Sequence, residues 1–182
     1  SASHNFVKFT CMGNNLSVVI MAAGLGTRMK SKLPKVLHAL DSKPLIIHLL
    51  EKAVALKPDS VTVVVGHGGE SVKAAAGEWA SKNGIRTPLV FVRQKLLKGS
   101  GRAILEAGSS FRKYKNVFIL SGDAPLTELN TLSSMLRKFY SSGADCLVLT
   151  CAVSDVKSYG RVVRDHSGNI KAVVEASDAS EE

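Results

Sequence analysis

The stretch SVVIMAAGLGTRMKSKLPK, residues 17–35, joins an apolar run to a loop that is rich in glycine and in cations. The apolar run is largely β-branched, which is typical of a strand that is buried on both faces. The two glycines of the loop permit backbone conformations that turn successive N–H groups toward an anion. Arg28 could donate two hydrogen bonds to phosphate oxygens, and Lys35 could add a mobile positive charge. The loop therefore suits a polyphosphate; the alternative is a tight turn with incidental surface cations.

The residues at the start of the loop are small, so a ligand could approach the backbone closely; they are Ala22, Ala23 and Gly24. The motif is not a dinucleotide-binding fingerprint, because its third glycine is missing. It is not a P-loop either, because the chain contains no G-x-x-x-x-G-K-[ST]. The pattern thus indicates phosphate binding without either of these two common arrangements.

Short apolar runs alternate with helical patterns along the rest of the chain. We expect strands at 17–21, 61–65, 89–92, 116–120 and 146–153, and helices at 44–56, 70–82, 100–111 and 128–140. Residues 160–164 and 170–175 flank a turn-forming Asp-His-Ser-Gly and predict a hairpin. The alternation predicts a Rossmann-like three-layer α/β sandwich with a mainly parallel sheet and a C-terminal antiparallel hairpin.

Ligands of such sheets bind at the carboxyl ends of the strands, so the loops that follow the strands should share one rim. Asp123 directly follows an apolar strand, and its carboxylate could hold Mg²⁺. Taken alone, an Asp that caps the next turn is the commoner situation. Gln94, with Gly99 and Ser100, could read the edge of a base, although this signal is weak by itself.

Composition limits the class of protein. The 182 residues are 45% hydrophobic and 21% charged, which is typical of a folded domain. No apolar stretch reaches the roughly 18 residues that a membrane span needs. The net charge of +9 suits a polyanion, but the cations are scattered and aromatic residues are few. A nucleic-acid binder, whose affinity would fall steeply with salt, is thus a minor alternative.

The three cysteines have no paired spacing, so neither a zinc site nor a disulfide framework is expected and a cytoplasmic location is the default. Cys146 and Cys151 lie in an apolar run and are expected to be buried. Residues 1–15 are expected to be a flexible leader or a remnant, and residues 16–182 a single domain.

Residues 16–38 closely resemble the signature of the sugar-phosphate nucleotidyltransferases, and in particular the bacterial N-acetylglucosamine-1-phosphate uridyltransferases. The likeness continues, in the order of that family, through residues 65–70, 94–103, 120–126, 159–164 and 174–181. It implies a Mg²⁺-dependent transfer from UTP to N-acetylglucosamine 1-phosphate, which yields UDP-N-acetylglucosamine and pyrophosphate.

The resemblance also implies site residues. Arg28 and Lys35 would act on the phosphates, and Asp123 would bind Mg²⁺. The nucleotide and the amino sugar would be contacted by Met21, Ala22, Ala23, Gly24, Gln94, Gly99, Ser100, Gly160 and Glu175. No nucleic-acid or membrane partner is implied, and an oligomer is expected only of a full-length form.

The chain departs from the family pattern at several positions. The family usually has Thr at Ser100, a polar residue at Leu97, Tyr at Ser121 and, in many members, Lys at Ser177. Its domain also continues beyond Glu182 with an Asn that completes the Mg²⁺ site, so we expect a domain truncated at its C-terminal end. Two alternatives stay open: another base or sugar specificity, and a nucleotide-binding domain without catalysis.

Overall fold

The computed structural model describes residues 15–24, 26, 29–31, 33–95, 99–155, 159–174 and 176, with the backbone alone at 99 and 100. The chain divides into two compact units, Ser1–Leu136 and Arg137–Glu182. The first unit contains the sheet and most of the helices, and the second contains the C-terminal hairpin. Within the described part of the chain, no helix has both the length and the apolar character of a membrane span.

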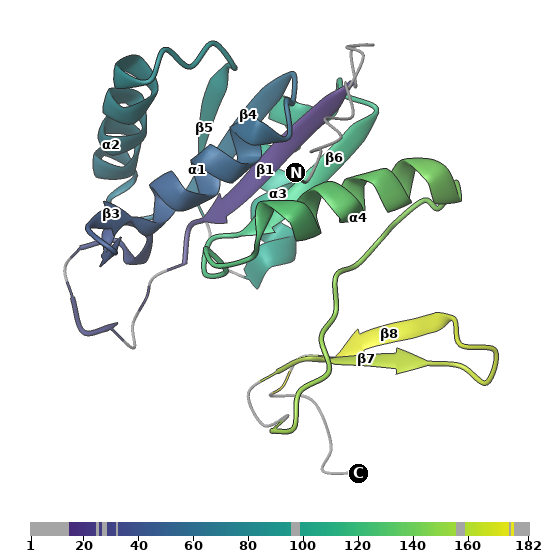
Figure 1. Cartoon of the computed structure of the whole chain (residues 1–182). Helices are drawn as coiled ribbons and strands as arrows, with labels where there is room; N and C mark the ends of the chain where they lie inside the picture. Colours follow the sequence, from purple (N-terminus) through teal and green to yellow (C-terminus); the bar gives the residue numbers. More distant parts are fainter. Residues whose placement is uncertain are drawn as a thin grey trace, which may run out of the picture. The chain divides into compact units, whose positions relative to one another are not determined.

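The first unit is built on a four-stranded sheet in the order β5-β4-β1-β6 (Figure 1). All three strand pairs are parallel. The register pairs Met21 with both Val64 and Ser121, so the central strands end at the same edge. The strands are β1 (Leu16–Ala22), β4 (Ser60–Val65), β5 (Leu89–Arg93) and β6 (Asn116–Ser121). Four of the predicted strands and the parallel sheet are therefore confirmed.

The four predicted helices are also present, with ends that differ by at most two residues from those expected. They are α1 (Leu45–Ala55), α2 (Gly69–Lys82), α3 (Gly99–Phe111) and α4 (Leu129–Ser142). A short 3-10 helix η2 (Lys35–Leu37) and a two-residue hairpin, β2 (Ala39–Leu40) with β3 (Lys43–Pro44), precede α1 and were not expected. Asp41 and Ser42 at the tip of this hairpin have positive φ angles of 50° and 62°. A two-residue turn of this kind can contain Asp, but the sequence Asp41-Ser42 is not the Asn-Gly pattern that would have predicted the turn.

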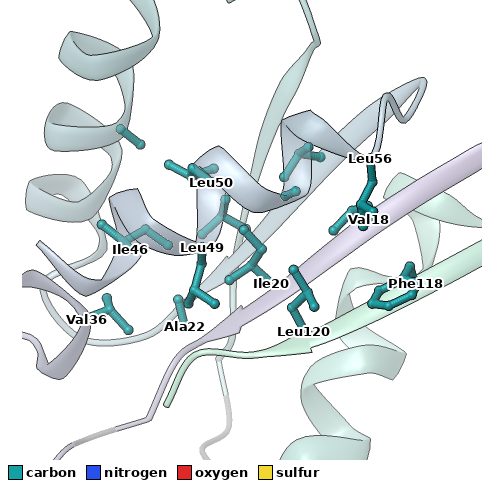
Figure 2. Close-up of a cluster of buried hydrophobic side chains, with 14 of the residues drawn as sticks. Val18, Ile20, Ala22, Val36, Ile46, Leu49, Leu50, Leu56, Phe118 and Leu120 are labelled. Carbon is teal, nitrogen blue, oxygen red and sulfur yellow. The ribbon is translucent and has the colours of Figure 1, made fainter. Parts of the chain in front are cut away.

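Both faces of the central strand β1 are buried, which explains its continuous β-branched sequence. Val18 and Ile20 belong to a cluster with side chains of α1 and with Phe118 and Leu120 of β6 (Figure 2). Val19 points to the opposite face, in a cluster that includes Ala103 and Ala107 of α3. Removing a fully buried Val or Ile from water contributes about 1.5–3 kcal/mol, so both layers stabilise the central strand.

The predicted strand at 146–153 is wrong, because residues 146–153 lie in neither a strand nor a helix. An apolar pattern marks which side chains a strand would bury, but a strand forms only where a neighbour satisfies its backbone hydrogen bonds. No described strand pairs with this segment. Cys146 and Cys151 are consequently exposed rather than buried.

The second unit contains the predicted hairpin, formed by β7 (Arg161–Arg164) and β8 (Ile170–Val174). Asp165 organises its turn, because Oδ1 accepts hydrogen bonds from the backbone N–H groups of Ser167 at 2.9 Å and Asn169 at 2.8 Å. Gly168 has a φ of 84°, which a glycine adopts without strain. The antiparallel extension expected from the sequence is confirmed.

Candidate active site at the carboxyl edge of the sheet

Two glycines let the ends of three strands approach one another closely. The N–H of Gly122, after β6, donates to the carbonyl of Met21 at 3.0 Å, and a Cβ at position 122 would overlap that carbonyl. A Cβ on Gly66, after β4, would lie 2.6 Å from the carbonyl oxygen of Ala23. The backbone that enters the Gly-rich loop is thus held between its two neighbours, and only glycine permits this spacing.

The return of the loop is packed against the same edge. Gly26 has a φ of 59°, and a Cβ there would lie 2.8 Å from Cβ of Lys35. Gly68 lies against Pro34, where a Cβ would approach the ring to 2.6 Å. These close contacts bring Lys35 back to the carboxyl ends of the strands.

Lys35 and Asp123 meet at this edge although 88 positions separate them in the sequence. The ammonium of Lys35 lies 3.4 Å from Oδ2 of Asp123, and the two side chains are 33% and 60% exposed. The hydroxyl of Ser121 donates to Oδ1 of Asp123 at 2.5 Å. The ammonium of Lys52, on α1, donates to the carbonyl of Pro125 and ties down the same loop.

The hydrogen bond from Ser121 is the main cause that holds the pKa of Asp123 below its ordinary value. The positive charge of Lys35 lowers the pKa further, while partial burial opposes both effects. Asp123 is therefore an ionised carboxylate at neutral pH, with one oxygen facing a cation.

Five further predicted residues of the first unit lie at the same edge. Met21 and Ala22 end β1, and Ala22 and Ala23 are only 5% and 7% exposed, whereas Gly24 is exposed. Gln94 follows β5, is 6% exposed, and its backbone N–H donates to the last carbonyl of β4 at 2.8 Å.

The structure does not show the other predicted residues at this edge. Arg28 and Glu175 lie outside the described residues. Gly99 and Ser100 begin α3, and the structure describes only their backbone. Gly160 is exposed and directly precedes β7 in the second unit. The roles given to these five residues stay predictions.

The loops that contain Gly66, Ser121 and Gly122 were expected to share the rim with the Gly-rich loop, but the contacts that these three residues make there were not. The sequence marked Ser121 only as a departure from the family, yet a hydroxyl two residues before a carboxylate is a spacing that allows a local hydrogen bond. Gly66 and Gly122 both follow apolar strands, which was the signal that could have identified them.

The donor set at Asp123 fits a magnesium ion that is shared with a ligand. Across the described ranges, no group of three or more His, Cys, Asp or Glu side chains forms a preassembled cage. Mg²⁺ usually keeps several waters and takes one or two carboxylates together with substrate phosphates. A single exposed carboxylate beside a lysine at the mouth of a Gly-rich loop has this character.

Comparison with known proteins identifies a family model and curated relatives that match this chain. A family model described as the MobA-like NTP transferase domain matches residues 18–166. The bifunctional protein GlmU of Ralstonia pickettii is 40% identical over 167 residues, covering 91% of this chain and 34% of that protein. The GlmU of Ralstonia nicotianae is 41% identical with the same coverage. The chain thus spans about a third of the length of these curated relatives.

Solved structures have the same fold. A UDP-glucose pyrophosphorylase complexed with UDP-glucose has a TM-score of 0.64 and 24% identity, over 90% of this chain and 70% of that chain. The UDP-glucose pyrophosphorylase of Acinetobacter baumanii has a TM-score of 0.65 and 20% identity, over 88% and 67%. At these identities, the likeness concerns the fold alone.

Proposed function

The chain belongs to the MobA-like NTP transferase family, which makes it a nucleotidyltransferase domain, and from this premise we propose its reaction. It transfers a uridylyl group from UTP to N-acetylglucosamine 1-phosphate, with Mg²⁺, and releases pyrophosphate. The observation that carries the proposal is the meeting of Lys35 and Asp123 beside the Gly-rich loop, at 3.4 Å. The similarity to GlmU proteins supports the choice of substrates.

The chemistry is an in-line displacement at phosphorus. A phosphate oxygen of the sugar phosphate forms a bond to the α-phosphorus of UTP, and the bond from that phosphorus to the β-phosphate oxygen breaks. Pyrophosphate leaves with the electron pair. Such a reaction needs mostly correct positioning and neutralisation of charge. When bound, Mg²⁺ would supply Lewis acidity and a template for the phosphates.

We assign positioning and charge neutralisation to individual residues. Lys35 donates hydrogen bonds to the phosphates from a side chain that is 33% exposed. Asp123 would hold the metal through a carboxylate that is ionised at neutral pH. The exposed Gly24 lets the triphosphate approach the backbone. Arg28 grips the β- and γ-phosphates.

Specificity is assigned to the remaining predicted residues. Gln94 and the start of α3, at Gly99 and Ser100, surround the uracil. Gly160 and Glu175 contact the amino sugar. The position of Gln94, hydrogen-bonded through its backbone to the last residue of β4, supports a base pocket on the β5 side of the sheet.

A pyrophosphate-release assay tests the proposal. UTP, CTP, GTP and ATP would each be mixed with N-acetylglucosamine 1-phosphate or glucose 1-phosphate, in Mg²⁺ or in EDTA. We expect release to be fastest with UTP and the amino-sugar phosphate and to stop in EDTA. A different preferred pair would reassign the specificity. Nucleotide binding without any release would make the chain a non-catalytic domain.

Matched variants connect this assay to the site. Asp123→Asn should lower the rate by about a hundredfold or more, because the metal loses its charged ligand. Lys73→Ala, on the exposed surface of α2, is the control and should leave the rate unchanged. Equal rates in the two variants would remove Asp123 from the site.

A further inference from the structure

Both oxygens of the Asp123 carboxylate are engaged, and by groups of different kinds. Oδ1 accepts the hydroxyl proton of Ser121 at 2.5 Å, and Oδ2 faces the ammonium of Lys35 at 3.4 Å. One contact is a hydrogen bond from a neutral hydroxyl to the charged carboxylate, and the hydroxyl lies two residues earlier, at the end of β6. The other is an ion pair with a residue of the Gly-rich loop.

We propose that Ser121 is a positioning residue, whose hydroxyl fixes the Asp123 carboxylate so that Oδ1 is occupied and Oδ2 is presented to a divalent cation. This inference rests on the proposed function, because the cation at Asp123 is part of it. Oδ2 alone would then be available to hold the cation, and the serine hydroxyl would act on Oδ1 only.

The backbone around the pair is anchored at several points. Ser121 ends β6 in register with Met21, and Gly122 donates to the Met21 carbonyl at 3.0 Å. The N–H of Ala124 donates back to the carbonyl of Ser121 at 3.3 Å, which closes a turn around Asp123. The contact of Lys52 with Pro125 holds the far side of the turn. A hydroxyl mounted on this frame has a fixed position from which to hold the carboxylate.

Exposure explains why such a restraint matters. The Asp123 side chain is 60% exposed, so packing alone leaves it free to rotate. Metal binding would then have to order the side chain and would lose affinity by doing so. The hydrogen bond to Oδ1 orders the carboxylate before the ion arrives.

The position of Lys35 identifies the oxygen that receives the ion. Its ammonium is the cation that occupies Oδ2 in this structure. Oδ2 of Asp123 would hold the divalent ion in place of the ammonium, and Lys35 would then be available to the phosphates of the substrate. A serine that only stabilised the turn would have no such connection to cation affinity.

The inference is tested by a Mn²⁺ titration of the chain without nucleotide, followed by paramagnetic broadening of the Asp123 amide signal in NMR spectra. Ser121→Ala should raise the dissociation constant of Mn²⁺ about three- to tenfold, because the ion would then have to order the Asp123 side chain when it binds. Ser121→Thr keeps the hydroxyl and should stay within about twofold of the parent chain. Ser109→Ala, at an exposed position on α3, is the control.

Thermal unfolding of each variant separates positioning from turn stability. The melting temperature of Ser121→Ala should equal that of the Ser109→Ala control, because a positioning role changes the affinity for the ion and leaves the fold intact. Unchanged affinity in Ser121→Ala, or a loss that appears only with a lower melting temperature, overturns the inference. Absence of broadening at Asp123 in the parent chain overturns both this inference and the metal site. Broadening that depends on Ser121, in a chain that releases no pyrophosphate, overturns only the proposed function.

Discussion

The lowered pKa of Asp123 makes its charge a stabilising feature of the folded chain at neutral pH. The hydrogen bond from Ser121 and the charge of Lys35 hold the pKa below the ordinary value of 3.8. A carboxyl group whose folded pKa is lowered stabilises the fold above its unfolded pKa, and this contribution is lost as the pH falls through the folded pKa. Protonation of Asp123 therefore does not limit activity near neutrality.

Lys35→Ala should affect metal binding and turnover in opposite directions. Without the competing ammonium, the affinity of Asp123 for Mn²⁺ should rise about two- to fivefold, a small effect because the pair is exposed. Pyrophosphate release should fall about a hundredfold, because a donor to the reacting phosphates is lost. The two measurements are the Mn²⁺ titration and the release assay. Weaker Mn²⁺ binding in the variant would mean that Lys35 helps to build the cation site instead of competing with the ion.

At this scale, the sequence identified the charged residues better than their neighbours. Lys35 was predicted as a mobile positive charge beside the Gly-rich loop and Asp123 as a carboxylate at a strand end, although for each the sequence alone left an ordinary structural role open. The Ser121 contact was not predicted, because a serine near an aspartate is equally common in ordinary turns. Close approach at Gly66 and Gly122 depends on the spacing of three strands, which no single segment contains.

The junction between β1 and β6 should be intolerant of a single methyl group. Gly122→Ala would place a Cβ against the Met21 carbonyl and force the two strand ends apart. We expect a loss of about 1–3 kcal/mol in the free energy of unfolding, typical of overpacking. Gly77→Ala is the matched control, since nothing lies within 4 Å of its Cβ in the middle of α2. It should stabilise the chain by about 0.5–1 kcal/mol. Denaturant unfolding measures both, and equal effects would contradict the close packing.

Acid should loosen the C-terminal hairpin through Asp165. Hydrogen bonds from Asn169 are the main cause that lowers the pKa of this carboxyl below 3.8. The stabilisation is therefore complete above about pH 4 and is lost as the pH falls through the lowered pKa. Amide chemical shifts of β7 and β8 should move toward unfolded values in acid. Asp165→Ala should show the loosened hairpin already at neutral pH; an unchanged spectrum would show that the turn does not depend on the carboxylate.

Among the elements, long periodic segments were predicted correctly, whereas a short hairpin was missed and a strand that depends on a partner was predicted wrongly. The helix at 44–56 and the strand at 61–65 have patterns that are sufficient by themselves, and α1 and β4 confirm them. The β2–β3 hairpin has two residues in each strand, too few to show a period. The strand expected at 146–153 failed because its formation depends on a partner edge, which local sequence does not specify.

At the scale of the whole molecule, alternation predicted a parallel sheet with its loops on one rim. It did not predict the order β5-β4-β1-β6, since parallel connections allow several orders. That order places β1 between β4 and β6, so Gly66 and Gly122 both reach the Gly-rich loop. Gly160 and Glu175 belong to the second unit. Their predicted contacts with the amino sugar are tested by measurements with sugar-phosphate substrates.

Calorimetric titration of the chain with UTP, CTP, GTP and ATP is the most direct test of whether this edge holds Mg²⁺-UTP. We expect UTP to bind most tightly in Mg²⁺, to lose most of its affinity in EDTA, and to bind weakly to Asp123→Asn under both conditions. Binding of all four nucleotides with equal affinity, or UTP binding that is insensitive to Mg²⁺ and to Asp123→Asn, would contradict the account.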